Sequence, residues 1–181
     1  ELKVSYPEYE FVPVYWMASE DHDFAEIQSV QLFQQVLKWD RSNGGAVGRK
    51  NLDGLETVIS EIHTKFQNHP DSEIHTLMDA LSGETYGKAF FQFVNELFGH
   101  YGLIIMDCYL PLWKEAFSTL LKQELITGFS SKAVEQTNQY LSQAGFPLQV
   151  EAKDTNLFYL SPEKRERIQR TATGFQIGSK E

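Results

Sequence analysis

Three scarcities in the 181-residue sequence each exclude a class of protein. It has a single cysteine, Cys108, which excludes an intrachain disulfide, and no cysteine and histidine pair has zinc-finger spacing. No apolar run approaches the roughly 18 residues of a membrane helix, and no charged segment followed by an apolar one opens the chain. We therefore expect a protein of the cytoplasm, which is a reducing compartment, and we expect no membrane partner.

Positive charge is also scarce. Lysine and arginine together number 16 against 25 aspartates and glutamates, for a net charge of −9. Nonspecific nucleic-acid binders neutralise phosphates with clustered cations, so nucleic acid is not an expected partner. The hydrophobic share of 41% and the aromatic share of 13% are typical of folded globular domains. The length fits one domain, or a core with one insertion.

Two short runs of apolar residues predict strands buried on both faces, at 11–16 and 102–107. Pro13 argues that the early part of the first run lies at an edge or outside the ladder, because proline cannot donate to the ladder. Helical patterns follow each run. The order strand, helices, strand, helices predicts an α/β domain with right-handed crossovers.

The spacing of apolar residues divides the chain into three segments. Residues 1–50 hold the core strand, a polar loop and short strands between 27 and 39. Residues 51–101 have the periodicity of three amphipathic helices and form a helical insertion. Residues 102–181 return to the α/β core. Beyond its first strand, this last segment is predicted to hold helices over 112–126 and 131–144 and small strands at 148–150, 157–160 and 165–169.

Polar residues before the insertion helices predict where each begins. Asn51 or Asp53 can cap the first helix, and the carboxylate of Asp71 is placed to cap the second. The third begins near Thr85 and ends at the glycines of 99–102.

Five adjacent side chains capable of acid–base or ligand chemistry form the polar run Ser19-Glu20-Asp21-His22-Asp23, which follows the first predicted strand by two residues. Open parallel sheets bind ligands beyond the carboxyl ends of their strands. His22 could act as acid or base, and the carboxylates could hold a cation or receive a proton from an attacking amine. A structural alternative carries equal weight: Ser19 caps a helix whose dipole stabilises Glu20 and Asp21. A metal site would need further ligands, and none is predicted.

Three arginines are candidates for anion binding. Arg49 ends the segment 44–49, which matches neither standard phosphate-loop pattern and is expected to be a turn leading into a short strand. Arg165 and Arg167 alternate on a predicted strand. These two either face an anionic substrate or form a solvated strand face.

Three further histidines and the cysteine are not expected to have a functional role. His63, His69 and His75 are six residues apart, which does not place all three on one helix face, so we expect them to be exposed. Cys108 is expected to be an inert buried thiol, because nothing nearby clearly lowers its pKa.

The string V-P-V-Y-W-M-A-S-E-D-H-D-F at 12–24 resembles the V-P-V-F-W-x-A-S-E-D-H-D-F segment of the bacillithiol-biosynthesis cysteine-adding enzymes. His100 departs from the family pattern, in which an acidic residue is common, and Cys108 is not a feature associated with the family. The likeness continues in the same order over nearly the whole chain, at 45–49, 97–103, 107, 134–138, 156–159 and 165–168.

The resemblance implies a Rossmann-like core related to nucleotidylyltransferases, with a helical connecting insertion. It also implies a ligase that adds cysteine to glucosaminyl-malate to complete bacillithiol. Amide formation in water needs an activated carboxyl, for which ATP or another nucleotide is chemically suited, although the residues do not identify the source of activation. The residues expected to be catalytic are Glu20, Asp21, His22 and Asp23, and those expected to bind substrate or nucleotide are Trp16, Ser19, Arg49, Asn156, Arg165 and Arg167.

Two parts that the resemblance implies are not among these residues: an upstream T-G-Q-Q-x-G-L-F-T-G-P-like motif, and a coiled coil that supports a homodimer. Because the chain also begins at Glu1, we expect an internal segment that is catalytically silent by itself. One alternative is a noncatalytic α/β module that binds a nucleotide or a partner through the helices between Leu52 and Tyr101. Another is a metal-dependent hydrolase centred on residues 21–23.

Overall fold

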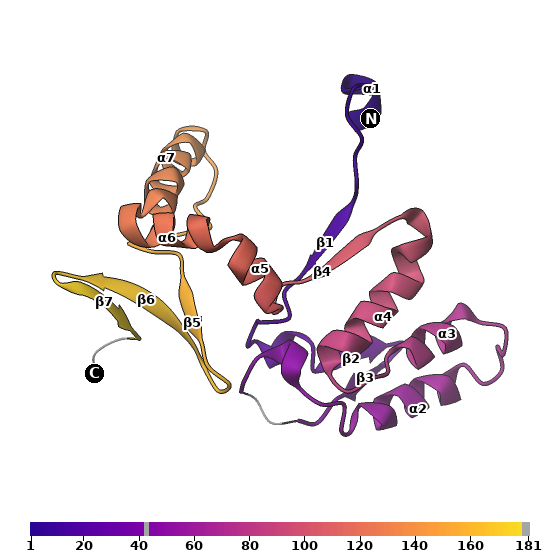
Figure 1. The fold of residues 1–181 in the computed structure, drawn as a ribbon. Coiled ribbons are helices and arrows are strands. Elements are labelled where there is room, and N and C mark those ends of the chain that lie inside the picture. Colours follow the sequence, from indigo (N-terminus) through magenta and orange to yellow (C-terminus); the bar gives the residue numbers. More distant parts are fainter. Residues whose placement is uncertain (42–43, 179–181) are drawn as a thin grey trace. The chain divides into compact units, whose positions relative to one another are not determined.

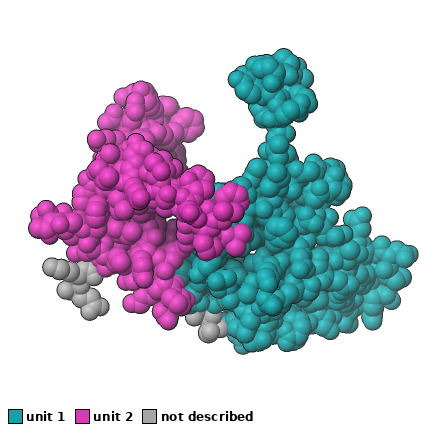
Figure 2. Space-filling model, in the orientation of Figure 1, with its two compact units in different colours: residues 1–109 teal, residues 110–181 magenta. Residues whose placement is uncertain are grey.

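The computed structural model describes residues 1–41 and 44–178, which form two compact units (Figure 2). The first unit is Glu1–Tyr109 and the second is Leu110–Glu181. The first contains the polar run that follows the first strand. The second contains three of the residues expected to bind substrate, and each unit is described by itself.

A pair of parallel strands carries the predicted α/β segment of the first unit: β1 (Val14–Met17) and β4 (Ile104–Asp107). Both strands were predicted, and β1 begins directly after Pro13, as expected. The expectation that they are buried on both faces is wrong for the described residues. Val14 and Trp16 are about half exposed, because each strand of a two-stranded sheet has one neighbour and little packs against its faces.

Three helices lie in the segment predicted to be a helical insertion: α2 (Leu55–Lys65), α3 (Glu73–Ala80) and α4 (Tyr86–Phe98) (Figure 1). Helix α3 contacts both α2 and α4, and α4 also contacts β4. The two short strands predicted between 27 and 39 are confirmed as an antiparallel hairpin of β2 (Ser29–Leu32) and β3 (Gln35–Lys38). Shorter elements of this unit are α1 (Leu2–Ser5) and the 3₁₀ helices η1 (Phe24–Glu26), η2 (Val47–Arg49) and η3 (Gly99–Tyr101).

The hydrophobic core of the first unit joins the hairpin to the insertion helices. The rings of Phe24 and Trp39 meet edge to face with their centroids 5.2 Å apart, and the Trp39 indole donates to the Asp53 carbonyl at 2.9 Å. This core anchors η1 and η2, which flank the polar run in space. Its buried members are Phe24, Leu37, Trp39, Val47, Leu55, Val58, Ile62 and Met78.

The helix starts confirm one predicted position and correct two predicted caps. Helix α4 begins directly after Thr85, as predicted, and the Thr85 side chain caps it. Asn51 and Asp53 do not cap α2, which begins after Gly54 in a left-handed conformation with φ of 83°. Asp71 does not cap α3 either. The cap is Ser72, whose hydroxyl accepts a hydrogen bond from a backbone amide of the first turn. Serine and aspartate both cap helices well.

The second unit combines helices with a three-stranded antiparallel sheet, whose strand order is β5-β6-β7. The helix predicted over 112–126 is two helices, which break at Phe117. The strand predicted at 148–150 is not formed, and a strand at 174–177 was not predicted. The elements are α5 (Pro111–Ala116), α6 (Ser118–Thr127), α7 (Phe129–Gln143), β5 (Phe158–Leu160), β6 (Arg165–Thr171) and β7 (Gly174–Ile177).

The Glu124 carboxylate is the buried polar centre of the second unit, with 4% of the residue exposed. It accepts hydrogen bonds from the Ser130 hydroxyl and amide and from the Asn156 amide. Burial raises the pKa of Glu124, but these donors and the Arg170 guanidinium outweigh it and hold the pKa below its usual value.

None of the helices described in residues 1–41 and 44–178 combines the length and the apolar character that a membrane span requires.

Candidate functional site

The polar run lies where two parallel strands end. Met17, the last residue of β1, is paired with Asp107, the last residue of β4, and the Cys108 amide donates to the Met17 carbonyl at 3.3 Å. Both carboxyl ends therefore meet at one edge of the sheet. In open α/β sheets this edge is the usual place for a ligand.

Ser19 is buried, and its hydroxyl is engaged within the fold. It donates to Asp107 Oδ1, and the Tyr109 amide donates both to Ser19 Oγ at 3.3 Å and to Asp107 Oδ1 at 3.0 Å. The next helix is the three-residue η1, whose N-cap is Asp23 and which has no side-chain cap bond. The alternative in which Ser19 caps a helix is therefore wrong.

The 3₁₀ helix η2 closes over the polar run. The Gly48 amide donates to the Ser19 carbonyl at 2.9 Å, and the Val47 amide donates to the Asp21 carbonyl at 2.6 Å. A Cβ on Gly48 would lie 2.6 Å from Ser19 Cβ, and a Cβ on Gly87 would lie 2.9 Å from the Gly48 oxygen. Both positions need glycine. The strand predicted after 44–49 is not formed; residues 50–54 lead instead into α2, which begins at Leu55.

The side chains of the polar run divide between two directions. Ser19, Asp21 and Asp23 line a cavity of about 260 Å³, whereas Glu20 and His22 do not. In the described part of the chain, Glu20 Oε2 and His22 Nε2 are buried without a hydrogen-bond partner. An unsatisfied buried polar atom costs about 1–3 kcal/mol, so a ligand or a water that bonded to either atom would stabilise the loop.

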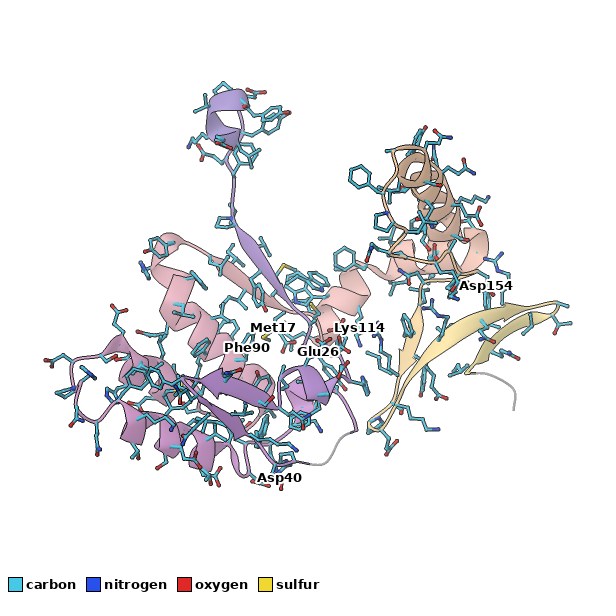
Figure 3. All side chains as sticks on the ribbon, turned by 180° about the vertical axis from the view of Figure 1, so that it is seen from behind. Met17, Glu26, Asp40, Phe90, Lys114 and Asp154 are labelled. Carbon is cyan, nitrogen blue, oxygen red and sulfur yellow. The ribbon has the colours of Figure 1, made fainter. Side chains whose placement is uncertain are left out.

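Most of the remaining lining of this cavity is aromatic or apolar. Tyr15 and Met17 come from β1 and Tyr86 and Phe90 from α4, and Glu26 of η1 adds a third carboxylate; Figure 3 labels Met17, Phe90 and Glu26 near one another. Burial raises the pKa of Tyr86 to about 12, with a smaller contribution from Tyr15. The Tyr86 phenol therefore keeps its proton near neutral pH and can donate a hydrogen bond.

The Asp21 carboxylate folds back onto its own backbone. Its Oδ1 accepts from the amides of His22 at 2.6 Å and Asp23 at 3.4 Å, which is an aspartate turn. Among residues 1–41 and 44–178, no group of three or more histidine, cysteine, aspartate or glutamate side chains is arranged to hold a metal ion.

Cys108 is a buried thiol, as predicted. The residue is buried, and burial, together with the Glu20 and Asp107 carboxylates, raises its pKa to about 12. The reactive thiolate is therefore scarce near neutral pH.

The other predicted residues of the first unit lie around the same strand ends. The Arg49 guanidinium stacks 4.3 Å from the centroid of the Tyr109 ring, and Trp16 lies half exposed on β1. Sequence reasoning missed the roles of Tyr109 and Gly48. Asp107 was not among the residues expected to form the site either. Its position, as a carboxylate at the end of the second predicted strand, was a signal that could have identified it.

Asn156 and Arg167 line a separate cavity of about 280 Å³ in the second unit, together with Lys153 and the first turn of α7. Arg167 donates to the Thr155 carbonyl at 2.8 Å. The guanidinium groups of Arg165 and Arg167 lie 4.0 and 4.5 Å from the centroid of one ring, that of residue 158. The structure thus groups these three predicted residues within the second unit.

Comparison with known proteins gives the family. The model for the N-terminal Rossmann-like domain of the bacillithiol biosynthesis protein BshC matches residues 1–181. A relative from Cytophaga hutchinsonii is 34% identical over 178 residues, which cover 97% of this chain and 32% of the relative. One from Christiangramia forsetii is 37% identical over 175 residues, 93% of this chain and 32% of the relative.

A third relative, from Halalkalibacterium halodurans, is 32% identical over 188 residues, 93% of this chain and 34% of the relative. All three relatives are named as the proposed cysteine ligase BshC. This chain spans about a third of their length. The predicted family and the Rossmann-like fold class are confirmed, and the chain belongs to the BshC family of bacillithiol biosynthesis, within its N-terminal Rossmann-like domain.

Proposed function

We propose that the full-length protein containing this domain joins the carboxyl group of cysteine to the amine of glucosaminyl-malate, which completes bacillithiol. Family membership and the name of the relatives support this assignment. Because the domain spans about a third of those relatives, the 181-residue chain alone is expected to be inactive.

The observation that carries the proposal is the pair of buried, unpartnered atoms Glu20 Oε2 and His22 Nε2 beside the two strand ends. When an amine attacks an activated carboxyl, a C–N bond forms, the activating group leaves, and the nitrogen loses a proton. A carboxylate or an imidazole can accept that proton. We assign this role to Glu20 and His22. The carboxylates of Asp21 and Asp23 attract the substrate while its amine is still an ammonium group. That group loses one proton to become the nucleophile and a second when the amide forms, so each of the two acceptors takes one proton.

ATP or another nucleotide would supply the activated carboxyl. The cavity of the second unit is lined by Lys153, Asn156 and Arg167, whose side chains can donate to phosphate or carboxylate oxygens. Glu151 also lines it and forms a salt bridge with Lys153. Arg49, Trp16 and Arg165 remain further candidates for binding substrate or nucleotide.

The experiment is a mass-spectrometric assay for bacillithiol, in which purified full-length protein receives cysteine and glucosaminyl-malate with or without ATP. Glu20→Gln and His22→Gln are expected to lower kcat by about 10²–10⁴-fold, the usual contribution of a general base. Glu8→Gln, on an exposed glutamate of the same unit, is the matched control and should keep parental activity. Parental kcat in both site variants would contradict the assignment. Absence of product with the parent protein would contradict the function, and would favour a noncatalytic binding module.

A further inference from the structure

His63 of α2 and His75 of α3 face each other across the contact between the two helices. Their Nδ1 atoms are 2.7 Å apart, the ring planes differ by 7°, and the centroids are 5.0 Å apart. With the nitrogens so close and the centroids so far apart, the rings meet edge to edge rather than one above the other. The expectation that both histidines are exposed is wrong, since both are partly buried.

The contacts of the outer ring nitrogens favour one tautomer in each ring. His75 Nε2 lies 3.2 Å from the His69 carbonyl oxygen, which can only accept, so this nitrogen carries a proton. His63 Nε2 lies 3.2 Å from Asp79 Oδ1, and an ionised carboxylate also only accepts. A neutral imidazole has one N–H. Two neutral rings in these tautomers would therefore direct two lone pairs at each other.

We infer that His63 and His75 hold one additional proton between their Nδ1 atoms, and that this imidazolium–imidazole pair is a pH-sensitive clamp between α2 and α3. The separation of 2.7 Å suits an N–H···N bond. Two imidazoles on one tetrahedral metal ion would be about 3.3 Å apart, given metal–nitrogen bonds of about 2.0–2.1 Å.

The groups around the pair are consistent with a single extra proton. Asp79 of α3 is the ionisable partner that contacts it in the described residues, and its negative charge balances the shared cation. The connection between the helices contributes the His69 carbonyl, and α2 contributes His63 itself.

The clamp depends on holding one shared proton. A second proton in acid would place two cations 2.7 Å apart, and loss of the shared proton in base would leave two opposed lone pairs. Its stabilisation therefore passes through a maximum at intermediate pH. Residues of both helices, including Val58, Ile62 and Met78, line an apolar cavity of about 280 Å³, so an open clamp would expose apolar surface.

The test uses long-range ¹H–¹⁵N correlation spectra of the histidine rings in the full chain, recorded between about pH 5 and 8, where imidazoles titrate. Both Nε2 atoms are expected to be protonated, with one proton shared by the two Nδ1 atoms. That shared proton should be lost in His75→Ala. It should persist in His69→Ala, which keeps the carbonyl and is the matched control.

Thermal unfolding gives the second measurement. The melting temperature of the parent should exceed that of His75→Ala by about 2–4 °C at intermediate pH, and the difference should shrink toward acid and base. Asp79→Asn changes an exposed side chain, so this variant is expected to fold. Because it removes the negative charge beside His63, the histidine pair should hold the shared proton less tightly. Two unprotonated Nδ1 atoms throughout the pH range would overturn the inference. So would one equivalent of Zn²⁺ that shifts both Nδ1 resonances, because the pair would then be a metal site.

Discussion

The Ser19 hydroxyl donates a hydrogen bond to the carboxylate of Asp107, 88 positions away in sequence, and so joins the ends of two parallel strands. The Tyr109 amide donates to both side chains, so all three groups depend on one another. Residues 20–23 begin directly after this contact. The position of the polar run is therefore set by β4 as much as by the strand that precedes it.

Replacement of Ser19 by alanine should destabilise the first unit. Asp107 would lose a buried donor and the Tyr109 amide one of its two acceptors, for an expected cost of about 1–3 kcal/mol in the free energy of unfolding. Urea denaturation of the chain measures it. Ser142→Ala, at an exposed position of α7, should change the value by less than about 0.5 kcal/mol. Equal effects of the two changes would show that the Ser19 contact contributes nothing.

Replacement of Gly48 by alanine should displace the polar run, because the new methyl group would collide with the backbone and Cβ of Ser19. Overpacking of this kind costs about 1–3 kcal/mol. The matched control is Gly174→Ala, where no atom lies within 4 Å of the added Cβ. Thermal unfolding of both variants checks the prediction, and it fails if Gly48→Ala melts with the parent protein.

The stability of the second unit should fall in acid because of Glu124. Its pKa is lower in the folded than in the unfolded chain, so its stabilisation is complete above the unfolded pKa and is lost as pH falls through the folded pKa. Glu124→Gln should destabilise the unit near neutral pH by about 1.5–3 kcal/mol and much less in acid. Hydrogen exchange at the Ser130 and Asn156 amides, corrected for intrinsic rates, measures the difference. A stability difference between Glu124→Gln and the parent that stays constant with pH would contradict this explanation.

Cys108 should resist alkylation in the folded chain. A pKa of about 12 leaves a thiolate fraction on the order of 10⁻⁵ near pH 7, and burial restricts access further. Mass spectrometry after iodoacetamide treatment should find the native chain unmodified and the urea-unfolded chain labelled. Rapid labelling of native protein would mean that the strand end opens.

The long-range contacts of the site could not be predicted from sequence. Spacing could not show that Ser19, Asp21 and Asp23 line a cavity while Glu20 and His22 do not, because a turn rotates successive side chains irregularly. The catalytic assignment from sequence is still a prediction. The division of the chain into 1–50, 51–101 and 102–181 also remains one.

What the sequence determined by itself was local: the strands β1 and β4, the β2–β3 hairpin and the start of α4 at Thr85. These follow from apolar periodicity and caps, which act over a few residues. Its long polar motif also identified the family. Only the tertiary structure decided that Ser19 meets Asp107 and that His63 meets His75, because such pairs form when separately specified elements pack together. No local pattern encodes the distance between them.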